Sequence, residues 1–313
     1  MRVLLIFIDG FGLGSNNPEI NPLVRFGLHT INEIFGQPMI HDIDSIETPE
    51  YCLIPIDATL GVAGLPQSAT GQAAILTGVN TAEIMGRHIQ AFPGPQLSKI
   101  ICDDNIMKKL TENGHTVTSA NMYTPDYFEL VAKRKRRHSA ITLAALSTGM
   151  TLRSLPEMNI GEAVYQDITN EMLSDYGIKG ISVIEPIQAA NNLVNISRKY
   201  SFTIFEYFQT DRAGHKQDWQ YAKRIVRILD EFIGEVYKRL PADTLLIITS
   251  DHGNFEDMSS KTHTFSKVPL IALGRQAKEL VSGITDLTGI APAIVKVLGK
   301  DDLRDRITRT SRQ

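Results

Sequence analysis

The chain has 313 residues and a formal net charge of −3, with 42% hydrophobic and 21% charged residues. This composition is that of an ordinary globular protein with one large or two modest domains, and the charge gives no general case for binding nucleic acid or a membrane. The two cysteines lack a Cys-x-x-Cys spacing and are compatible with a reducing cytosol, so we expect a cytoplasmic location. No segment approaches the ~20 apolar residues of a membrane-spanning helix.

The chain begins with a run that predicts a buried strand, residues 2–8, which ends at Asp9. The run is short, meets an acid and lacks a small-residue cleavage site, so we favour a first strand over a signal sequence. The glycines of residues 10–14 do not have the spacing of a dinucleotide-binding loop, and we expect an irregular loop there. Residues 23–36 predict one helix, and residues 37–59 predict short strands within irregular structure.

A loop rich in Gly and Pro then leads into a short Ala-rich helix that Gly78 is expected to end. Ser68 lies at or near the start of this helix. There, free backbone N–H groups and the helix dipole favour an anion, or a hydroxyl that must ionise. The alternative is a plain helix-capping serine. Thr70 is the rival nucleophile in the same segment, and phosphoenzyme trapping with each residue changed to Ala would separate the two.

The middle of the chain predicts a helix at residues 97–113 and a strand at residues 115–120. From 123 to 185 the pattern is irregular and more polar, and we expect a small inserted cap over the sheet edge. Its basic run, Lys133 to His138, is either a solvated surface or a phosphate-attracting rim. A helix is expected to follow at residues 139–147.

The last third alternates helices and strands. Helices are predicted at residues 186–200, 217–239 and 288–298, the last with Gly299 as its stop, and strands at 202–208, 245–250 and 268–273. Such alternation predicts an α/β fold with a mostly parallel central sheet and helices on both faces. We assign residues 1–122 and 186–313 to this core and residues 123–185 to the insert.

Metal-ligand residue types follow the predicted strands, where the carboxyl edge of an α/β sheet binds ligands. Asp9, Asp211 and the pair Asp251-His252 should converge there, and His215 and His263 can reach the same edge. Three aspartates and three histidines need a counter-charge in a partly buried pocket. Mixed carboxylate and imidazole ligands favour Zn²⁺ or Mn²⁺, with Mg²⁺ as a further possibility, and the number of ligands suits two ions ~3.5–4 Å apart.

With these motifs in this order, the chain resembles the alkaline phosphatase superfamily of metalloenzymes, nearest to its cofactor-independent phosphoglycerate mutase and phosphopentomutase branch. The matching stretches are Asp9-Gly10, Ser68 before a helix ending Thr77-Gly78, Asp211-x-x-x-His215, Asp251-His252-Gly253-Asn254, His263 and the closing Thr288 to Pro292. The resemblance implies one metal held by Asp211, His215 and His263, and a second held by Asp9, Asp251, His252 and the oxygen of Ser68, which is also the nucleophile.

Two departures limit the resemblance to the mutases. Their nucleophile loop usually has His after the glycine, whereas this chain has Gln72. They also carry a large inserted phosphotransferase domain, and the stretch between Ser68 and Asp211 is too short to hold it. The resemblance therefore implies metal-dependent phosphoryl chemistry more firmly than mutase specificity.

We accordingly expect a two-metal enzyme that acts on a small phosphorylated substrate through a phosphoserine at Ser68, as a phosphomonoesterase or a phosphomutase. Arg87, His88 and Asn254 are candidate substrate contacts, with plain surface charge as the alternative for the first two. The competing hypotheses are a phosphodiesterase or phosphonate hydrolase on the same scaffold and a non-catalytic metal-binding protein. A sulfatase is disfavoured because its formylglycine signal is absent around Ser68. Nucleic-acid binding would rest on the basic run alone.

Overall fold

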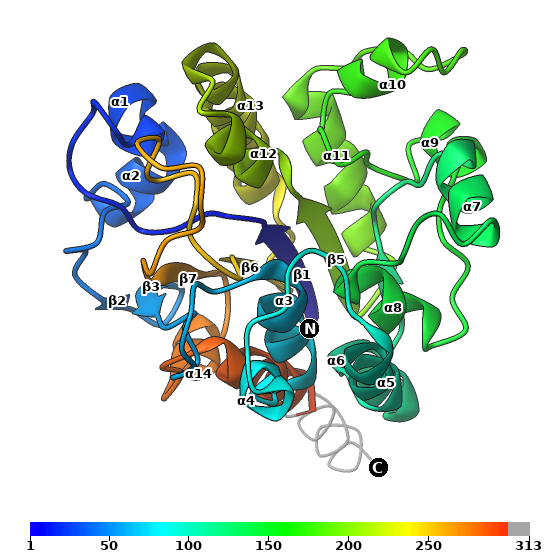
Figure 1. Ribbon diagram of the computed structural model, residues 1–313, viewed down its shortest axis with the longest axis horizontal. Coiled ribbons are helices and arrows are strands. Elements are labelled where there is room, and N and C mark those ends of the chain that lie inside the picture. Colours follow the sequence, from blue (N-terminus) through cyan, green and yellow to red (C-terminus); the bar gives the residue numbers. More distant parts are fainter. Residues whose placement is uncertain (300–313) are drawn as a thin grey trace, which may run out of the picture.

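The computed structural model describes residues 1–299, which build one seven-stranded sheet in the order β2-β3-β7-β6-β1-β5-β4 (Figure 1). The strands are β1 (Arg2–Ile8), β2 (Ile46–Glu47), β3 (Tyr51–Ile56), β4 (Val117–Ser119), β5 (Phe202–Tyr207), β6 (Thr244–Thr249) and β7 (Val268–Leu273). Strand β1 pairs in parallel with β6 and β5, and β5 pairs in parallel with β4. On the other side of β6 the pairs are antiparallel: β7 with β6, β3 with β7 and β2 with β3. Strand β3 therefore points along β1 again, and the predicted α/β fold with a mostly parallel sheet is confirmed.

Strand β1 is apolar at every position from Val3 to Ile8 because both faces of the sheet are covered. Leu4 and Ile6 belong to the hydrophobic cluster on one face, and Leu5 and Phe7 to the cluster on the other. All four side chains are at most 1% exposed. The central position of β1 thus fixes where its carboxyl end, and Asp9 after it, must lie.

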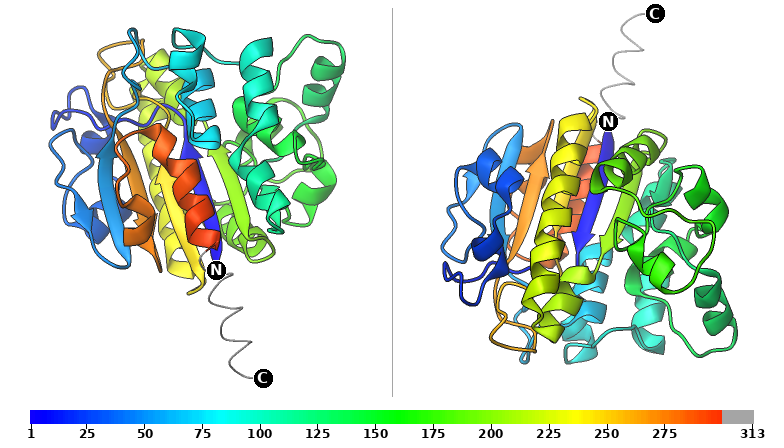
Figure 2. Two further views of the ribbon diagram at one scale, coloured as in Figure 1. Left: turned by 90° about the horizontal axis from the view of Figure 1, so that it is seen from below. Right: turned by 90° about the horizontal axis from the view of Figure 1, so that it is seen from above.

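Two layers of helices cover the sheet (Figure 2). One face packs against α1 (Pro22–Phe26), α2 (His29–Phe35), α11 (Pro186–Ser197) and α13 (Trp219–Arg239). The other packs against α3 (Ser68–Thr77), α4 (Thr81–Met85), α5 (Pro95–Asp103), α6 (Ile106–Glu112), α14 (Ala277–Val281) and the helical residues 290–299. The short helix α12 (Gln209–Lys216) follows β5 at the carboxyl edge of the sheet.

Two helices that periodicity predicts as continuous are broken, so those predictions are wrong in detail. Residues 23–36 form α1 and α2, separated at Gly27, which has a φ of 76° that other residues rarely adopt. Residues 97–113 form α5 and α6, because the side chain of Asn105 accepts hydrogen bonds from the first backbone N–H groups of α6. Apolar periodicity carries across such a break, since both halves face the same core.

The closing helix begins with a 3-10 turn, Leu287–Gly289, and continues through residues 290–299. Gly299, the predicted stop, is still helical. Residues 300–313, which we assigned to the core, lie outside the part of the chain that the structure describes. Among residues 1–299, no helix is both long and apolar enough to cross a membrane.

The segment 123–185 contains α7 (Pro125–Ala132), α8 (Ala140–Leu146), α9 (Leu155–Asn159) and α10 (Glu171–Asp175). Helix α8 packs against α3 and α5 and belongs to the hydrophobic cluster on the sheet face that those two helices cover. Met122, Met158 and Leu173 instead belong to a small separate cluster. The division of the chain into a core and a cap stays a prediction, with α8 anchoring the segment beside the carboxyl edge.

Candidate metal centre and nucleophile

Two neighbouring parallel strands deliver the first group of ligands. Asp9 directly follows β1, and Asp251 and His252 follow β6, which pairs with β1. The Nε2 atom of His252 lies 3.3 Å from Oδ1 of Asp9 and 3.6 Å from Oδ2 of Asp251. We call Asp9, Asp251 and His252 the inner cluster, because all three are buried.

The electrostatics of the inner cluster favour a cation. Burial, followed by repulsion from neighbouring carboxylates, raises the pKa of Asp9 and of Asp251 well above the usual range. Burial, followed by repulsion from His263, lowers the pKa of His252 to about 3, so this imidazole supplies no positive charge near neutral pH. Oδ1 of Asp9 is buried and receives no hydrogen bond from residues 1–299. A divalent ion fits this donor set, since it offsets both carboxylates and binds neutral imidazole.

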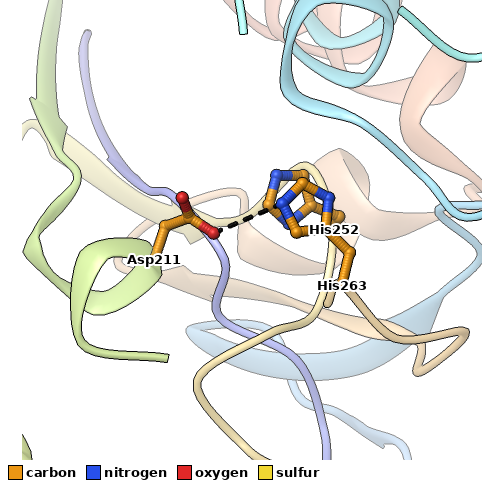
Figure 3. Close-up of side chains that lie close together, drawn as sticks. All are labelled: Asp211, His252 and His263. Carbon is orange, nitrogen blue, oxygen red and sulfur yellow. Dashed lines mark ion pairs between the residues drawn. The ribbon is translucent and has the colours of Figure 1, made fainter. Parts of the chain in front are cut away.

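A second group, the outer cluster, consists of Asp211, His215 and His263 (Figure 3 shows Asp211 and His263). Asp211 and His215 are one turn apart on α12, with 3.2 Å between Oδ2 and Nε2. His263, from the loop between β6 and β7, places Nε2 3.5 Å from Oδ1 of Asp211. The ring of His263 stacks on His252 with 3.7 Å between centroids, so the two clusters are adjacent.

In the outer cluster, hydrogen bonds and imidazoles of the protein itself stabilise the negative charge of the carboxylate. Burial acts to raise the pKa of Asp211, but hydrogen bonds and the neighbouring imidazoles outweigh it and lower the pKa to about 2. Nδ1 of His263 donates to the carbonyl of Pro66 at 2.7 Å, and Nδ1 of His215 to that of Lys261 at 2.6 Å. These bonds leave both Nε2 atoms directed at Asp211, which is how proteins orient metal-binding histidines.

Asn254, a candidate substrate contact, has a fully buried side chain, and its role in substrate binding stays a prediction. Its amide donates to Oδ1 of Asp211 at 2.7 Å and therefore orients this carboxylate. Glu256, which the sequence analysis missed, accepts hydrogen bonds from the backbone N–H groups of Gly12 and Asn254 and from the hydroxyl of Thr264. This fully buried carboxyl ties together three segments that carry the candidate ligands; its place two residues after Asn254 was the available signal.

Ser68 is the first residue of α3, as predicted, and Gly78 caps the helix. The Oγ atom of Ser68 lies 3.0 Å from Nε2 of His252. Helix α3 approaches this closely because Gly71 has no side chain: a Cβ there would lie 2.8 Å from Cβ of Asp251. The rival Thr70 is fully buried and bonds to the carbonyl of Gln67, away from the cavity described next.

A cavity of about 270 Å³ opens over Ser68, Asp9 and Asp211. Its other wall comes largely from the segment after β4, with Tyr123, Tyr127, Thr142, Arg136 and Arg137 among the residues that line it. The guanidinium of Arg136 lies 5.2 Å from the ring centre of Tyr127, and that of Arg137 lies 5.8 Å from that of Phe92. Two residues of the basic run therefore face the site.

Arg87 and His88 line a separate depression beside the loop before α3, together with Gly64 and Leu65. Their role in substrate binding stays a prediction. Gln72, the departure from the mutase pattern, lines the main cavity, and its amide lies 3.5 Å from Oδ2 of Asp251. Arg212 points away from the outer cluster, since it contacts Gln209 and Met172 beside another cavity.

Comparison with known proteins gives the family and the fold of the chain. A family model described as the metalloenzyme superfamily matches residues 1–302. The chain is 31% identical over 112 residues to a 2,3-bisphosphoglycerate-independent phosphoglycerate mutase of Methylobacillus flagellatus, a match covering 33% of this chain and 22% of the relative. It is 30% identical over 152 residues to the enzyme of that name from Acetivibrio thermocellus, covering 44% of this chain and 29% of the relative. The aligned parts thus span less than a third of these relatives.

The fold has a solved counterpart in Thermus thermophilus alkaline phosphatase. The TM-score is 0.53 with 12% sequence identity, over 95% of this chain and 91% of that one. At this identity the likeness concerns the fold alone. Because the family model extends over nearly the whole length, the chain belongs to the metalloenzyme superfamily, with an alkaline phosphatase-like α/β fold.

Proposed function

We propose that the protein is a two-metal phosphoryl-transfer enzyme that acts on a small phosphate monoester through a phosphoserine at Ser68. The observation that carries this proposal is the placement of the Ser68 hydroxyl at the start of α3, 3.0 Å from His252 and in one cavity with Asp9 and Asp211. The inner cluster would hold one ion together with Ser68, and the outer cluster the other. Zn²⁺ and Mn²⁺ suit these ligands best, with Mg²⁺ as a further candidate.

When bound, divalent ions lower the pKa of a coordinated hydroxyl and offset negative charge on a transferring phosphoryl group. The chain itself supplies position and charge. Ser68 Oγ gives up its proton to solvent and attacks the phosphorus in line, so that the Ser68 O–P bond forms as the ester P–O bond breaks. The ester oxygen leaves with the electron pair of that bond and takes up a proton from solvent. The positive end of the α3 dipole favours the phosphoryl oxygens, and Arg136 and Arg137 attract the dianion into the cavity.

The phosphoserine then has two fates. Attack by water gives a phosphomonoesterase, whereas attack by another hydroxyl of the same substrate gives a phosphomutase. The curated relatives are mutases, but this chain spans less than a third of their length, so both outcomes belong to the proposal. A phosphodiesterase or phosphonate hydrolase is the second candidate, because the same cavity would admit an esterified or carbon-linked phosphorus group.

Phosphoenzyme trapping tests the proposal. The purified protein is loaded with Mn²⁺ or Zn²⁺, incubated with p-nitrophenyl phosphate, quenched in acid and analysed by peptide mass spectrometry. We expect nitrophenol release and a phosphate on Ser68. Ser68→Ala should lose both, whereas the matched variant Thr70→Ala should keep the phosphoserine.

Phosphorylation of the Ser68→Ala protein would contradict the proposal, and so would metal-dependent turnover without any trapped intermediate. Parallel assays with bis(p-nitrophenyl) phosphate and a phosphonate ester separate the second candidate from the first. Complete inactivity of the metal-loaded protein on all three would favour the non-catalytic alternative.

A further inference from the structure

Glu206 is the acidic residue of the buried and mostly apolar strand β5, and it lines the cavity over Ser68. It is 8% exposed. Asn121 fixes its backbone on both sides: Oδ1 of Asn121 accepts from the Glu206 N–H at 2.8 Å, and Nδ2 donates to the Glu206 carbonyl at 2.7 Å. The backbone that carries this side chain is therefore fixed in the cavity wall.

The carboxyl group of Glu206 has no hydrogen-bond or ion-pair partner among residues 1–299. The nearby hydroxyls are engaged elsewhere, since that of Tyr123 bonds to Thr142 at 2.9 Å and that of Tyr127 to His138 at 2.6 Å. Burial alone raises the pKa of Glu206 to about 7. Buried polar groups are nearly always hydrogen-bonded, so an unpartnered acid facing a cavity indicates a ligand that supplies the missing donor.

Glu206 does not belong to either candidate metal group. Glu206 is absent from the inner cluster and from the outer cluster, and also from the close set of ligand atoms that Asp211 forms with His252 and His263 within residues 1–299. The partner of Glu206 is therefore expected to come from the organic part of the substrate. An ammonium group is disfavoured there, because Arg136 and Arg137 already bring positive charge to the same cavity.

We propose that Glu206 determines specificity by accepting a hydrogen bond from a hydroxyl group on the leaving group, so that the substrates are phosphate monoesters of polyhydroxylated alcohols. This inference rests on the proposed function of the same cavity. A hydroxyl suits the group in either charge state, since it donates to a carboxylate and accepts from a carboxylic acid. The aromatic rings of Tyr123 and Tyr127 offer flat apolar surface for the C–H groups of such an alcohol.

Binding to the non-reactive Ser68→Ala protein tests this inference independently of turnover. Calorimetry with the Mn²⁺-loaded protein compares glycerol 1-phosphate with propyl phosphate, which has the same carbon chain without hydroxyls. We expect glycerol 1-phosphate to bind about tenfold more tightly or better. Adding Glu206→Leu should bring the two dissociation constants within about threefold of each other, mainly by weakening the glycerol ester. Glu206→Gln, which keeps one acceptor oxygen, should retain part of the preference.

Glu235→Gln is the matched control, because Glu235 is also nine-tenths buried but lies on α13 outside the cavity. It should leave the preference unchanged. Equal binding of the two esters by Ser68→Ala, absence of binding, or a preference that survives Glu206→Leu would overturn the inference. Loss of bound metal in Glu206→Leu would also overturn the inference. So would a result in which only 2-aminoethyl phosphate, measured in the same way, binds more weakly to Glu206→Leu. The proposed function is tested separately, and it fails if the unsubstituted protein forms no phosphoserine in the trapping experiment.

Discussion

The inner and outer clusters use similar residues but stand in opposite electrostatic states. The inner cluster has two buried carboxyls with raised pKa values beside an imidazole that stays neutral. In the outer cluster a single carboxylate lies between two imidazoles, its pKa is lowered to about 2, and that of His215 is raised by their hydrogen bond. The outer cluster is thus largely compensated by the protein, whereas the inner cluster requires protons or a metal ion.

This difference follows from where the chain places each group. The candidate inner ligands come from the ends of β1 and β6 in the middle of the sheet, where Asp251 and His252 are fully buried and Asp9 is 9% exposed. The outer ligands come from α12 and a loop at the rim, and the side chain of His215 is 44% exposed. Ser68 adjoins the inner cluster, so the proposed nucleophile lies beside the cluster with the greater demand for a cation.

The largest contrast should appear in the formation of phosphoserine. Asp251→Ala removes an inner ligand beside Ser68 and should slow trapping by about 1,000-fold or more, because several kcal/mol of charge stabilisation are lost. His215→Ala removes an exposed outer ligand and should slow it by only about 10- to 100-fold. Rapid-quench measurement of phosphoserine at saturating metal gives both rates. Equal losses, or a larger loss in His215→Ala, would contradict the assigned difference between the clusters.

The second-largest expected effect is a change in metal affinity at one cluster and not at the other. Asn254→Ala removes the amide that orients Asp211 and should weaken the outer site by about 10- to 100-fold, leaving the inner site within about threefold. Competition titration with a chromophoric chelator resolves the two affinities. Asn113→Ala, at the exposed C-terminal end of α6, serves as the control. A weakened inner site with an intact outer site would show that Asn254 acts elsewhere.

Metal-free stability should change in opposite directions when each cluster loses a charge. A raised pKa at Asp251 means that stability falls as the pH rises above 3.8, so Asp251→Asn should stabilise the chelator-treated protein at pH 7. Asp211 contributes stability that is present above pH 3.8 and lost as the pH falls towards 2, so Asp211→Asn should cost about 2 kcal/mol at pH 7. Denaturant unfolding in EDTA measures both. Shifts of the same sign would refute the electrostatic contrast.

Sequence alone predicted that the acidic and histidine side chains following the strands lie together, because the carboxyl ends of parallel strands share one edge of the sheet. Asp9, Asp251 and His252 needed only that rule. The same reasoning missed the breaks at Gly27 and Asn105, since apolar periodicity continues across them.

The opposite wall of the cavity could not be predicted from local pattern. Arg136 and Arg137 face the site only because the segment after β4 folds back over the sheet edge, which is a matter of tertiary packing. Glu206 had a local signal, as the acid in the run from Phe202 to Tyr207, but nothing in the sequence distinguished a cavity wall from a buried ion pair. The sequence showed the motif that contains Asn254 but not the burial of its side chain.

Anomalous diffraction from crystals grown with Mn²⁺ or Zn²⁺ tests the central claim most directly. Two peaks are predicted, ~3.5–4 Å apart. One should be coordinated by Asp9, Asp251, His252 and Ser68, and the other by Asp211, His215 and His263. A single peak, or peaks bound by other residues while these side chains keep their present positions, would contradict the two-metal account.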